Sequence, residues 1–242
     1  MAASVLLVRF RSEPERAAVL LDVDGTLAPI VERPEDAAVP EEARAEVARL
    51  AERYGLVACV SGRVSADIRR MVGVKRVEYV GVHGLEGDPN AERFIPRLKA
   101  FAERTDWPWT VENKAGVVLS FHYREAPDED DASRLADEIA REAKAAGLTP
   151  HHGRKVLEVR PPVQADKGTA VRRLLGERGV PRALYAGDDT TDLDAFRGLE
   201  DADLDVALKV AVASKEMNPA MLTRADLVVD GPGELLSLLK TL

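Results

Sequence analysis

Residues 19–30 read VLLDVDGTLAPI. An apolar run ends at Asp22, a second carboxylate follows at Asp24, and a Gly-Thr pair marks a turn. Alternate residues of a β-strand point to the same face, so both carboxylates are expected on one side of the chain where a buried strand ends. Two like charges placed in this way are costly unless a cation lies between them or a reaction uses both. The stretch therefore predicts a polar site at the end of a strand.

Similar apolar runs recur along the chain and alternate with helical patterns. We expect strands over residues 17–25, 55–63, 77–84, 182–189, 203–211 and 225–231, and helices over 40–55, 65–73, 167–179, 191–199 and 233–242. Strands that alternate with helices predict an α/β, Rossmann-like core, a parallel sheet with helices on both faces. Sites in such sheets gather at the carboxyl ends of the strands.

Residues 93–162 have a different character. A strand-like stretch over 107–127 is followed by an amphipathic helical pattern over 128–147 and a strand with alternating faces over 155–162. This order predicts a small α+β domain inserted into the core. The expected division is therefore a core of residues 1–92 and 163–242 and an insert of residues 93–162.

Composition excludes several classes of protein. The formal charge of the 242 residues is −8 and the basic residues are scattered, whereas a nucleic-acid surface needs a concentrated basic face. The sequence shows neither a signal peptide nor an apolar run long enough to span a membrane, so we expect a cytoplasmic protein with no membrane partner. The single cysteine, Cys59, lies in an apolar run and is expected to be a buried thiol.

Four polar sequences follow strands of the predicted core. They are Asp22, Asp24 and Thr26; Ser61, Gly62 and Arg63; Lys167; and Asp188 with Asp189 and Asp192. Each has an ordinary explanation by itself, as a turn, a helix cap or a solvated lysine. Together they provide a nucleophile, a general acid, a cation site and donors for phosphate oxygens, which phosphoryl transfer requires.

The carboxylates suggest distinct chemical roles. Asp22 would attack phosphorus, and Asp24 would protonate the leaving oxygen and later deprotonate water. Mg²⁺ prefers hard oxygen ligands and would be held by Asp22, the Asp24 carbonyl and Asp188. Asp189 and Asp192 would orient Asp188, a bound water or Lys167, although Asp192 could equally cap the following helix. The phosphate oxygens would be held by the remaining groups, namely Thr26, Ser61, Gly62, Arg63 and Lys167.

The order of these motifs resembles that of the haloacid dehalogenase (HAD) superfamily, and the resemblance covers nearly the whole chain. DVDGTL, SGR, Lys167 and GDDTTD look like its four motifs in order. The insert lies between the second and third motifs, the position at which members with the larger, type 2 cap carry their cap domain. The resemblance thus implies a HAD core with an α+β cap.

Within that superfamily the chain is similar to the trehalose-6-phosphate phosphatases. The similar stretches are LLDVDGTLAPI, VSGR, YVGVHGLEG, LSFHYR, GRKVLEVRPP, DKGTAV and GDDTTDLDAF. The resemblance implies magnesium-dependent hydrolysis of trehalose 6-phosphate, with a functional link to trehalose-6-phosphate synthase. It also implies substrate contacts from His83, Gly84, Glu86, Asn113, His122, Arg124, Arg154, Glu158 and Arg160. Strand alternation places Glu158 and Arg160 on one face and Lys155 on the other.

Several alternatives stay open at this point. Related phosphatases with the same core act on glucosyl- or mannosyl-3-phosphoglycerate or on sucrose 6-phosphate, and the core motifs recognise only the phosphate. A non-catalytic sugar-phosphate sensor would normally lose the nucleophile, the acid or a metal ligand, and all of these residues are present here. A phosphotransferase would use the same aspartyl-phosphate, although a large cap should admit one sugar phosphate and then water. His151 and His152 are expected in a solvated turn rather than at a metal site, and Trp107 and Trp109 are expected to pack in the cap.

Overall fold

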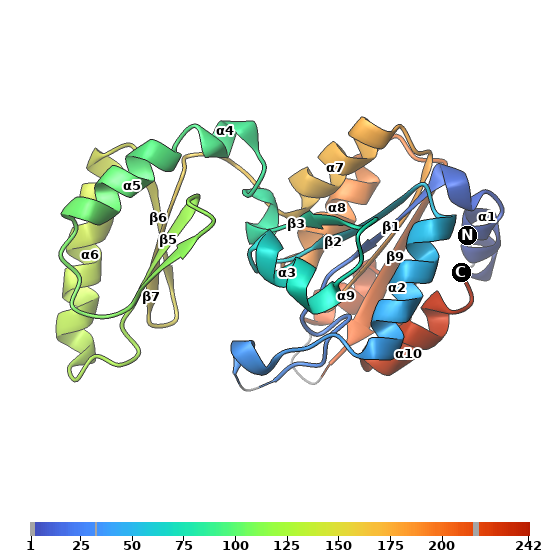
Figure 1. Cartoon of the computed structure of the whole chain (residues 1–242), viewed down its shortest axis with the longest axis horizontal. Coiled ribbons are helices and arrows are strands. Elements are labelled where there is room, and N and C mark those ends of the chain that lie inside the picture. Colours follow the sequence, from blue (N-terminus) through green and yellow to red (C-terminus); the bar gives the residue numbers. More distant parts are fainter. Residues whose placement is uncertain (1–2, 32, 215–217) are drawn as a thin grey trace. The chain divides into compact units, whose positions relative to one another are not determined.

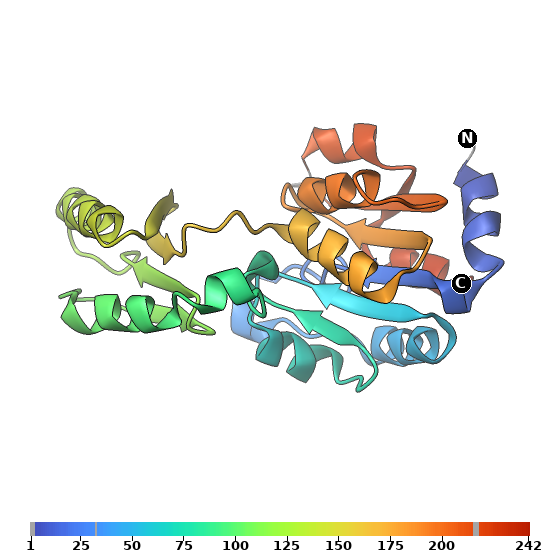
Figure 2. The ribbon, with the colours of Figure 1, turned by 90° about the horizontal axis from the view of Figure 1, so that it is seen from above.

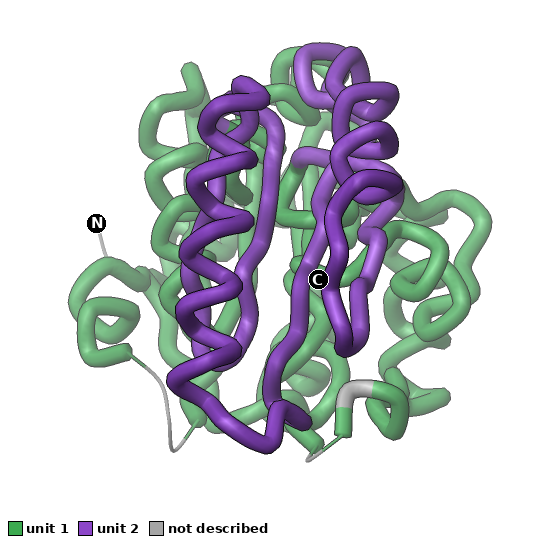
Figure 3. Tube along the Cα trace, turned by 90° about the vertical axis from the view of Figure 1, so that its left-hand side faces the viewer, with its two compact units in different colours: residues 1–84, 165–242 green, residues 85–164 purple. Residues whose placement is uncertain are grey.

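The computed structural model describes residues 3–31, 33–214 and 218–242 (Figure 1). The chain divides into two compact units: unit 1 comprises Met1–Gly84 and Ala165–Leu242, and unit 2 comprises Leu85–Gln164 (Figure 3). The predicted insert of residues 93–162 begins later, so residues 85–92, with the short helix α4 (Pro89–Glu92), group with unit 2 rather than with the core. In the described part of the chain, no helix is long and apolar enough to cross a membrane.

Unit 1 is built on a six-stranded sheet in the order β10-β9-β8-β1-β2-β3. Its strands are β1 (Ala17–Leu21), β2 (Leu56–Val60), β3 (Glu78–Val80), β8 (Arg182–Gly187), β9 (Val206–Ala213) and β10 (Leu227–Asp230). All five neighbouring pairs are parallel. The central strands β1 and β2 are buried throughout, as their continuous apolar sequences predict. The predicted α/β core is confirmed.

Helices cover both faces of this sheet (Figure 2). One face carries α1 (Ala3–Arg11), α2 (Glu41–Arg53), α3 (Ser65–Val72) and α10 (Gly231–Leu239), and the other carries α7 (Lys167–Arg178), α8 (Asp192–Glu200) and α9 (Pro219–Arg224). Short 3₁₀ turns span Pro14–Arg16, Pro34–Asp36 and Val82–Gly84. Helix α1 was not predicted. Its buried Phe10 stacks on Tyr54 with ring centroids 5.4 Å apart, a tertiary contact that no local pattern reveals.

Unit 2 is an antiparallel four-stranded sheet in the order β4-β5-β7-β6, with helices packed on one face. The strands are β4 (Val111–Lys114), β5 (Val118–His122), β6 (Thr149–Gly153) and β7 (Val156–Arg160), and the helices after α4 are α5 (Ile95–Arg104) and α6 (Glu129–Ala145). Trp107 packs edge-on against Phe121 in this core, with ring centroids 5.7 Å apart. The predicted α+β character is confirmed.

Two local predictions in unit 2 differ from the structure. The expected single strand over 107–127 is a hairpin, because Ala115 and Gly116 adopt left-handed backbone angles (φ +52° and +77°) and turn the chain. The expected solvated turn at His151 and His152 is wrong, since both lie in β6 and pair with β7. The sequence TPHHG lacks the apolar alternation of a buried strand because β6 lies at the edge of the sheet.

The strand register of unit 1 aligns the carboxyl ends of β1, β2 and β8. Leu21 of β1 pairs with Cys59 of β2 on one side and with Ala186 of β8 on the other. The residues that follow these strands therefore meet at one edge of the sheet. This edge carries the first, second and fourth polar sequences identified above.

Candidate active site

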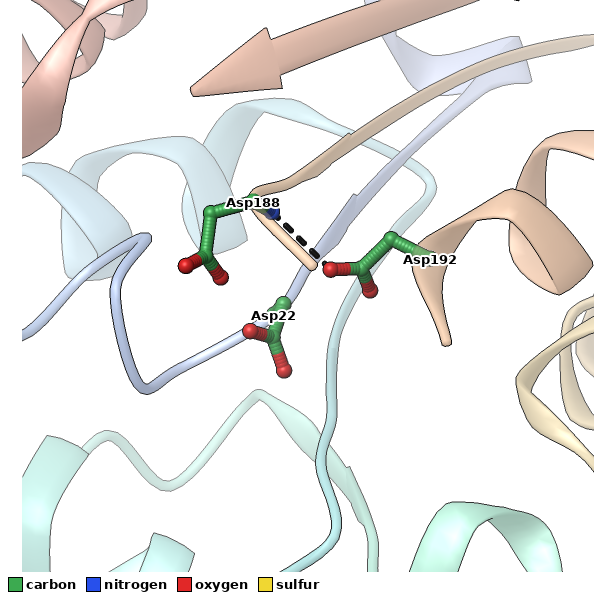
Figure 4. Close-up of side chains that lie close together, drawn as sticks. All are labelled: Asp22, Asp188 and Asp192. Carbon is green, nitrogen blue, oxygen red and sulfur yellow. Dashed lines mark hydrogen bonds between the residues drawn. The ribbon is translucent and has the colours of Figure 1, made fainter. Parts of the chain in front are cut away.

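Asp22 is the first residue after β1 and is buried. Its N–H donates to the carbonyl of Ala186 at 2.9 Å, so the backbone stays paired to β8 while the strand ends. Figure 4 shows its carboxylate facing those of Asp188 and Asp192. Oxygen atoms of these three groups lie within 4.8 Å of one another.

Lys167 supplies the positive charge of this cluster. It is the first residue of α7, whose start is fixed by a capping box: Asp166 accepts from the N–H of Thr169 at 2.7 Å. The buried Lys167 Nζ donates to Asp22 Oδ1 at 2.8 Å and to Asp192 Oδ1 at 2.7 Å. Burial works against its charge, but the two carboxylates outweigh that effect and raise the pKa of Lys167. Lys167 is therefore a fixed ammonium beside Asp22.

Asp192 has no capacity left for a metal ion. Its Oδ1 accepts from Lys167 and from the Tyr185 hydroxyl, the latter at 2.7 Å. Its Oδ2 accepts from the N–H groups of Asp188 and Asp189 at 2.9 and 3.0 Å. Four donors occupy the roughly four lone-pair sites of a carboxylate. The fully buried Asp192 is thus placed to orient Lys167, Tyr185 and the backbone that precedes α8.

Tyr185 also belongs to the site, although it was not predicted from the sequence. It lies within β8, and its ring packs edge-on against Phe196 with centroids 6.2 Å apart. Burial and the nearby Asp192 carboxylate raise the pKa of Tyr185, so its hydroxyl remains a donor. A signal was present in the sequence, because a tyrosine in a buried strand needs a partner for its hydroxyl.

Asp188, like Asp22, is a carboxylate that retains oxygen lone pairs for a ligand. Gly25, with φ +78°, passes so close that a Cβ at that position would lie 2.0 Å from Asp188 Oδ2, so only glycine fits there. The Thr26 hydroxyl, expected to hold phosphate, donates instead to Asp188 Oδ1 at 3.4 Å. Asp189 accepts from the N–H and the hydroxyl of Thr191 and so shapes the turn into α8.

The charge balance of this cluster fits a divalent cation. Three buried carboxylates face one ammonium. Burial, together with the neighbouring carboxylates, raises the pKa of Asp22 and brings that of Asp188 to about 6. Asp22 and Asp188 retain oxygen lone pairs, and carboxylate oxygens are the ligands that Mg²⁺ prefers. A cation here would offset the excess negative charge.

The raised pKa of Asp188 predicts how the stability of the metal-free protein depends on pH. The folded protein keeps a proton on Asp188 between pH 4 and 6 that the unfolded chain has lost. The free energy of unfolding should therefore fall by about 1 kcal/mol as pH rises from 4.5 to 7.5, after allowance for solvent screening. Urea unfolding in EDTA measures this slope.

Two controls isolate the contribution of Asp188. Asp188→Asn should flatten the slope, and millimolar Mg²⁺ should also flatten it because the cation replaces the proton. An unchanged slope in Asp188→Asn would contradict the assignment.

Asp24 lies two residues after Asp22, and its side chain contacts the loop that follows β2. Arg63 Nε donates to Asp24 Oδ2 at 2.7 Å and Arg63 Nη2 donates to Asp24 Oδ1 at 2.8 Å. Arg63 was predicted to hold phosphate, whereas in the structure its side chain contacts Asp24. Ser61 is buried, and its Oγ accepts from the Arg63 N–H at 3.2 Å while keeping its own proton to donate.

The segment after β3 closes over this loop. The N–H of His83 donates to the Ser61 carbonyl at 2.9 Å. The His83 imidazole packs so closely on Gly62 that a Cβ at position 62 would lie 2.6 Å from His83 Nε2. Val82 and His83 both have positive φ, 50° and 54°. Such angles cost free energy, most of all for a β-branched residue, and are concentrated at functional sites. The structure thus places His83 beside the second motif.

Unit 2 holds a separate polar cluster on the sheet face that α5 and α6 leave uncovered. Glu158 of β7 accepts from Lys114 at 3.0 Å, from Ser120 at 3.3 Å and from Arg160 at 3.0 Å. Burial opposes its ionisation, but Arg160 and Lys114 outweigh burial and lower the pKa of Glu158 to about 2. His122 lies on the same face, 3.1 Å from Glu112.

Other expected contact residues of unit 2 lie apart from this cluster. Asn113 has the opposite strand parity and accepts from the Gly116 N–H at 2.7 Å in the hairpin turn. Arg124 and Arg154 are exposed in turns after β5 and β6. Lys155 pairs with Glu129 at 2.7 Å. Glu86 lies just after Gly84, near the start of unit 2.

Solved structures share this fold. A haloacid dehalogenase-like hydrolase from Bacteroides thetaiotaomicron matches with a TM-score of 0.63 at 13% identity, over 93% of this chain and 98% of that one. A trehalose-6-phosphate phosphatase related protein matches with a TM-score of 0.70 at 26% identity, over 93% and 96%. The core sheet and its helices thus have the haloacid dehalogenase-like fold.

Sequence comparison narrows the class. The sequence model of the Trehalose-phosphatase family matches residues 20–113 and 96–231. Probable trehalose-phosphate phosphatase G of Arabidopsis thaliana is 32% identical over 274 aligned positions, which cover 96% of this chain and 70% of that protein. The chain spans between 60 and 70% of the length of that relative and of trehalose-phosphate phosphatase B from the same plant. The chain belongs to the trehalose-phosphatase family.

Proposed function

We propose that this chain hydrolyses trehalose 6-phosphate to trehalose and inorganic phosphate with Mg²⁺ as its cofactor. The observation that carries the proposal is the buried group of Asp22, Lys167 and Asp188 at the carboxyl edge of the sheet. Membership of the family supports the choice of substrate. The presence of a nucleophile, an acid and carboxylates for a metal favours an enzyme over a sugar-phosphate sensor.

In the first step, an Asp22 carboxylate oxygen attacks phosphorus and the bond from phosphorus to the sugar oxygen breaks. Asp24 gives its proton to that oxygen, so trehalose leaves as an alcohol and an aspartyl-phosphate remains on Asp22. Lys167 directs one Asp22 oxygen and stabilises the negative charge on the phosphoryl oxygens.

In the second step, water attacks phosphorus and Asp24 accepts its proton. The bond from phosphorus to Asp22 breaks, which releases inorganic phosphate and restores the carboxylate. A bound Mg²⁺, held by Asp22, the Asp24 carbonyl and Asp188, would supply charge neutralisation and orient the phosphate. Asp192 keeps Lys167 and the Asp188 backbone in place through both steps.

Selection of the sugar is assigned to the polar face of unit 2. Lys114 and Arg160, two of the basic groups on that face, are both paired with Glu158. A phosphoglycerate substrate would need unpaired basic groups for its carboxylate. The pairing therefore favours a substrate recognised through sugar hydroxyls. Because Lys114, Ser120 and two N–H groups of Arg160 already donate to Glu158, we assign Glu158 to holding Lys114 and Arg160 in place as donors to those hydroxyls.

Phosphate release from a panel of substrates tests the proposal. The panel contains trehalose 6-phosphate, sucrose 6-phosphate, glucosyl-3-phosphoglycerate and glucose 6-phosphate, each with Mg²⁺ and with chelator. Magnesium-dependent release with preference for trehalose 6-phosphate is expected. Preference for the glycerate would transfer the function to a related phosphatase, and release from none would exclude the enzyme.

Glu158→Ala tests the role of unit 2. The KM for trehalose 6-phosphate should rise about tenfold or more, because Lys114 and Arg160 lose the carboxylate that holds them in place for the sugar hydroxyls. The KM for an aryl phosphate without these hydroxyls should change little. Glu129→Ala, which breaks only the exposed pair with Lys155, is the matched control. Equal effects on both substrates would contradict the assignment.

A further inference from the structure

The two-point contact between Arg63 and Asp24 takes no part in either step of the proposed reaction. Two parallel N–H···O bonds join the guanidinium to both carboxylate oxygens. The hydrogen bond to Asp24 is also the main cause of the raised pKa of Arg63. The Arg63 side chain is 18% exposed and that of Asp24 is 40% exposed, so the pair is partly shielded from water. A pair with this geometry fixes orientation as well as charge.

The backbone of Arg63 is held in place by the loop around it. Its N–H donates to Ser61 Oγ at 3.2 Å, and its carbonyl accepts from the Val82 N–H at 2.9 Å. Ser61 is itself tied to the segment after β3 on both sides: its N–H donates to the Val80 carbonyl, and its carbonyl accepts from His83. The guanidinium therefore projects from an anchored loop, whereas Asp24 lies in a turn with a more exposed side chain.

We propose that Arg63 is a positioning residue for Asp24, a two-point support that aims the acid at the leaving oxygen. This inference rests on the proposed function, because it assigns Arg63 to the acid of that reaction. It differs from the phosphate-binding role expected from sequence. With its Nε and Nη2 on Asp24, the guanidinium is assigned an indirect role, through the group that protonates the leaving oxygen.

Positioning of an acid matters in proportion to the basicity of the leaving group. A sugar alkoxide leaves poorly without a proton, whereas a nitrophenolate leaves without assistance. Loss of a well-placed general acid costs about 10²- to 10⁴-fold for the first kind of leaving group. Arg63 therefore has an effect on turnover that depends on the leaving group, which neither a phosphate ligand nor a purely structural residue would show.

The test compares kcat for trehalose 6-phosphate and for 4-nitrophenyl phosphate in four proteins: wild type, Arg63→Ala, Asp24→Asn and the double variant. Arg63→Ala should lower kcat for the sugar phosphate about 30-fold or more and that for the aryl phosphate less than about threefold. In the Asp24→Asn background, adding Arg63→Ala should cost nothing further on the sugar phosphate, because the two residues act as one unit.

Two further variants separate positioning from charge and from folding. Arg63→Lys keeps the charge but lacks the planar fork, so its kcat for the sugar phosphate should fall about tenfold while the fold persists. Arg70→Ala removes another arginine that pairs with an aspartate, the exposed Arg70–Asp67 pair of α3, and should change neither substrate. Circular dichroism and thermal melting confirm that each variant is folded.

The outcomes distinguish this inference from the function on which it depends. If Arg63→Ala slows both substrates equally, or if its effect multiplies with that of Asp24→Asn, Arg63 binds the phosphate and the inference is wrong. If Arg63→Lys retains full activity, charge alone suffices and the two-point support is wrong. If the wild type releases phosphate from neither substrate with Mg²⁺, the proposed function itself fails.

Discussion

Asp22→Asn is expected to lower turnover of trehalose 6-phosphate by about 10⁴-fold or more while the protein stays folded. An amide oxygen at this position cannot form the aspartyl-phosphate, whereas the shape of the side chain is kept. The measurement is phosphate release with Mg²⁺, together with thermal melting in EDTA.

The stability of the same variant gives an independent readout. Burial and two neighbouring carboxylates raise the pKa of Asp22 although Lys167 opposes them, so keeping Asp22 ionised costs the folded protein stability relative to the unfolded chain. Asn removes that cost, and Lys167 keeps Asp192 as a partner. The variant should therefore melt at the same temperature as wild type or higher, a separation of stability from activity typical of catalytic groups.

Asp230→Asn is the matched control. Asp230 also ends a strand of the sheet, the edge strand β10, but its side chain is exposed there and makes no cap hydrogen bond. Its replacement should leave turnover and melting unchanged. Appreciable turnover in Asp22→Asn would show that another residue attacks phosphorus and would overturn the mechanism.

Lys167→Met should damage both stability and catalysis. Methionine is of similar length but leaves the buried carboxylates of Asp22 and Asp192 without their counter-ion. Breaking a buried ion pair from one side costs about 3–5 kcal/mol. Turnover should fall about 10³-fold or more, because Asp22 loses the donor that aims it. Urea unfolding and steady-state kinetics measure the two effects.

The pH dependence of this variant has a definite sign. Without the ammonium, the pKa values of the remaining carboxylates rise further, so the folded variant binds more protons than the unfolded chain. Its deficit in stability should therefore be smaller at pH 5 than at pH 7.5, and Mg²⁺ should reduce the deficit at pH 7.5.

Lys209→Met is the control for Lys167→Met. Lys209 lies on β9 of the same sheet and pairs with Glu200 at 2.7 Å outside the site. Its loss should cost less than about 1 kcal/mol and leave turnover unchanged. If Lys167→Met proved as mild as this control, the buried charge cluster would not have the energetic importance assigned to it.

The parallel core could be predicted from sequence because its signals are local. Apolar runs such as residues 17–21 and 56–60 must be buried on both faces, and alternation with helices leaves few other architectures. The place of each motif at a strand end follows from the same pattern. The antiparallel edge strand β6 and helix α5 were missed, since their residues are half polar and gain order mainly from neighbours distant in sequence.

Within the site, some residues could be named from sequence but their partners could not. Asp22, Lys167 and Asp188 were expected together, and the structure brings them together. The contact of Arg63 with Asp24 joins segments that are far apart in the chain. The hydrogen bond from the Tyr185 hydroxyl to Asp192 forms inside the buried core. No spacing rule predicts such contacts, because they depend on rotamers chosen by packing.

The sequence by itself therefore determined the class of fold and the chemical types gathered at one sheet edge, because strand burial and strand-end position are local consequences of residue order. Only the tertiary structure decided which oxygens of those carboxylates already accept hydrogen bonds from protein groups. All four acceptor positions of Asp192 are taken, both oxygens of Asp24 meet Arg63, and Asp22 and Asp188 keep lone pairs for a cation. A carboxylate's role depends on which donors reach it, and those donors come from helix α7, from strand β8 and from the loops after β2 and β8.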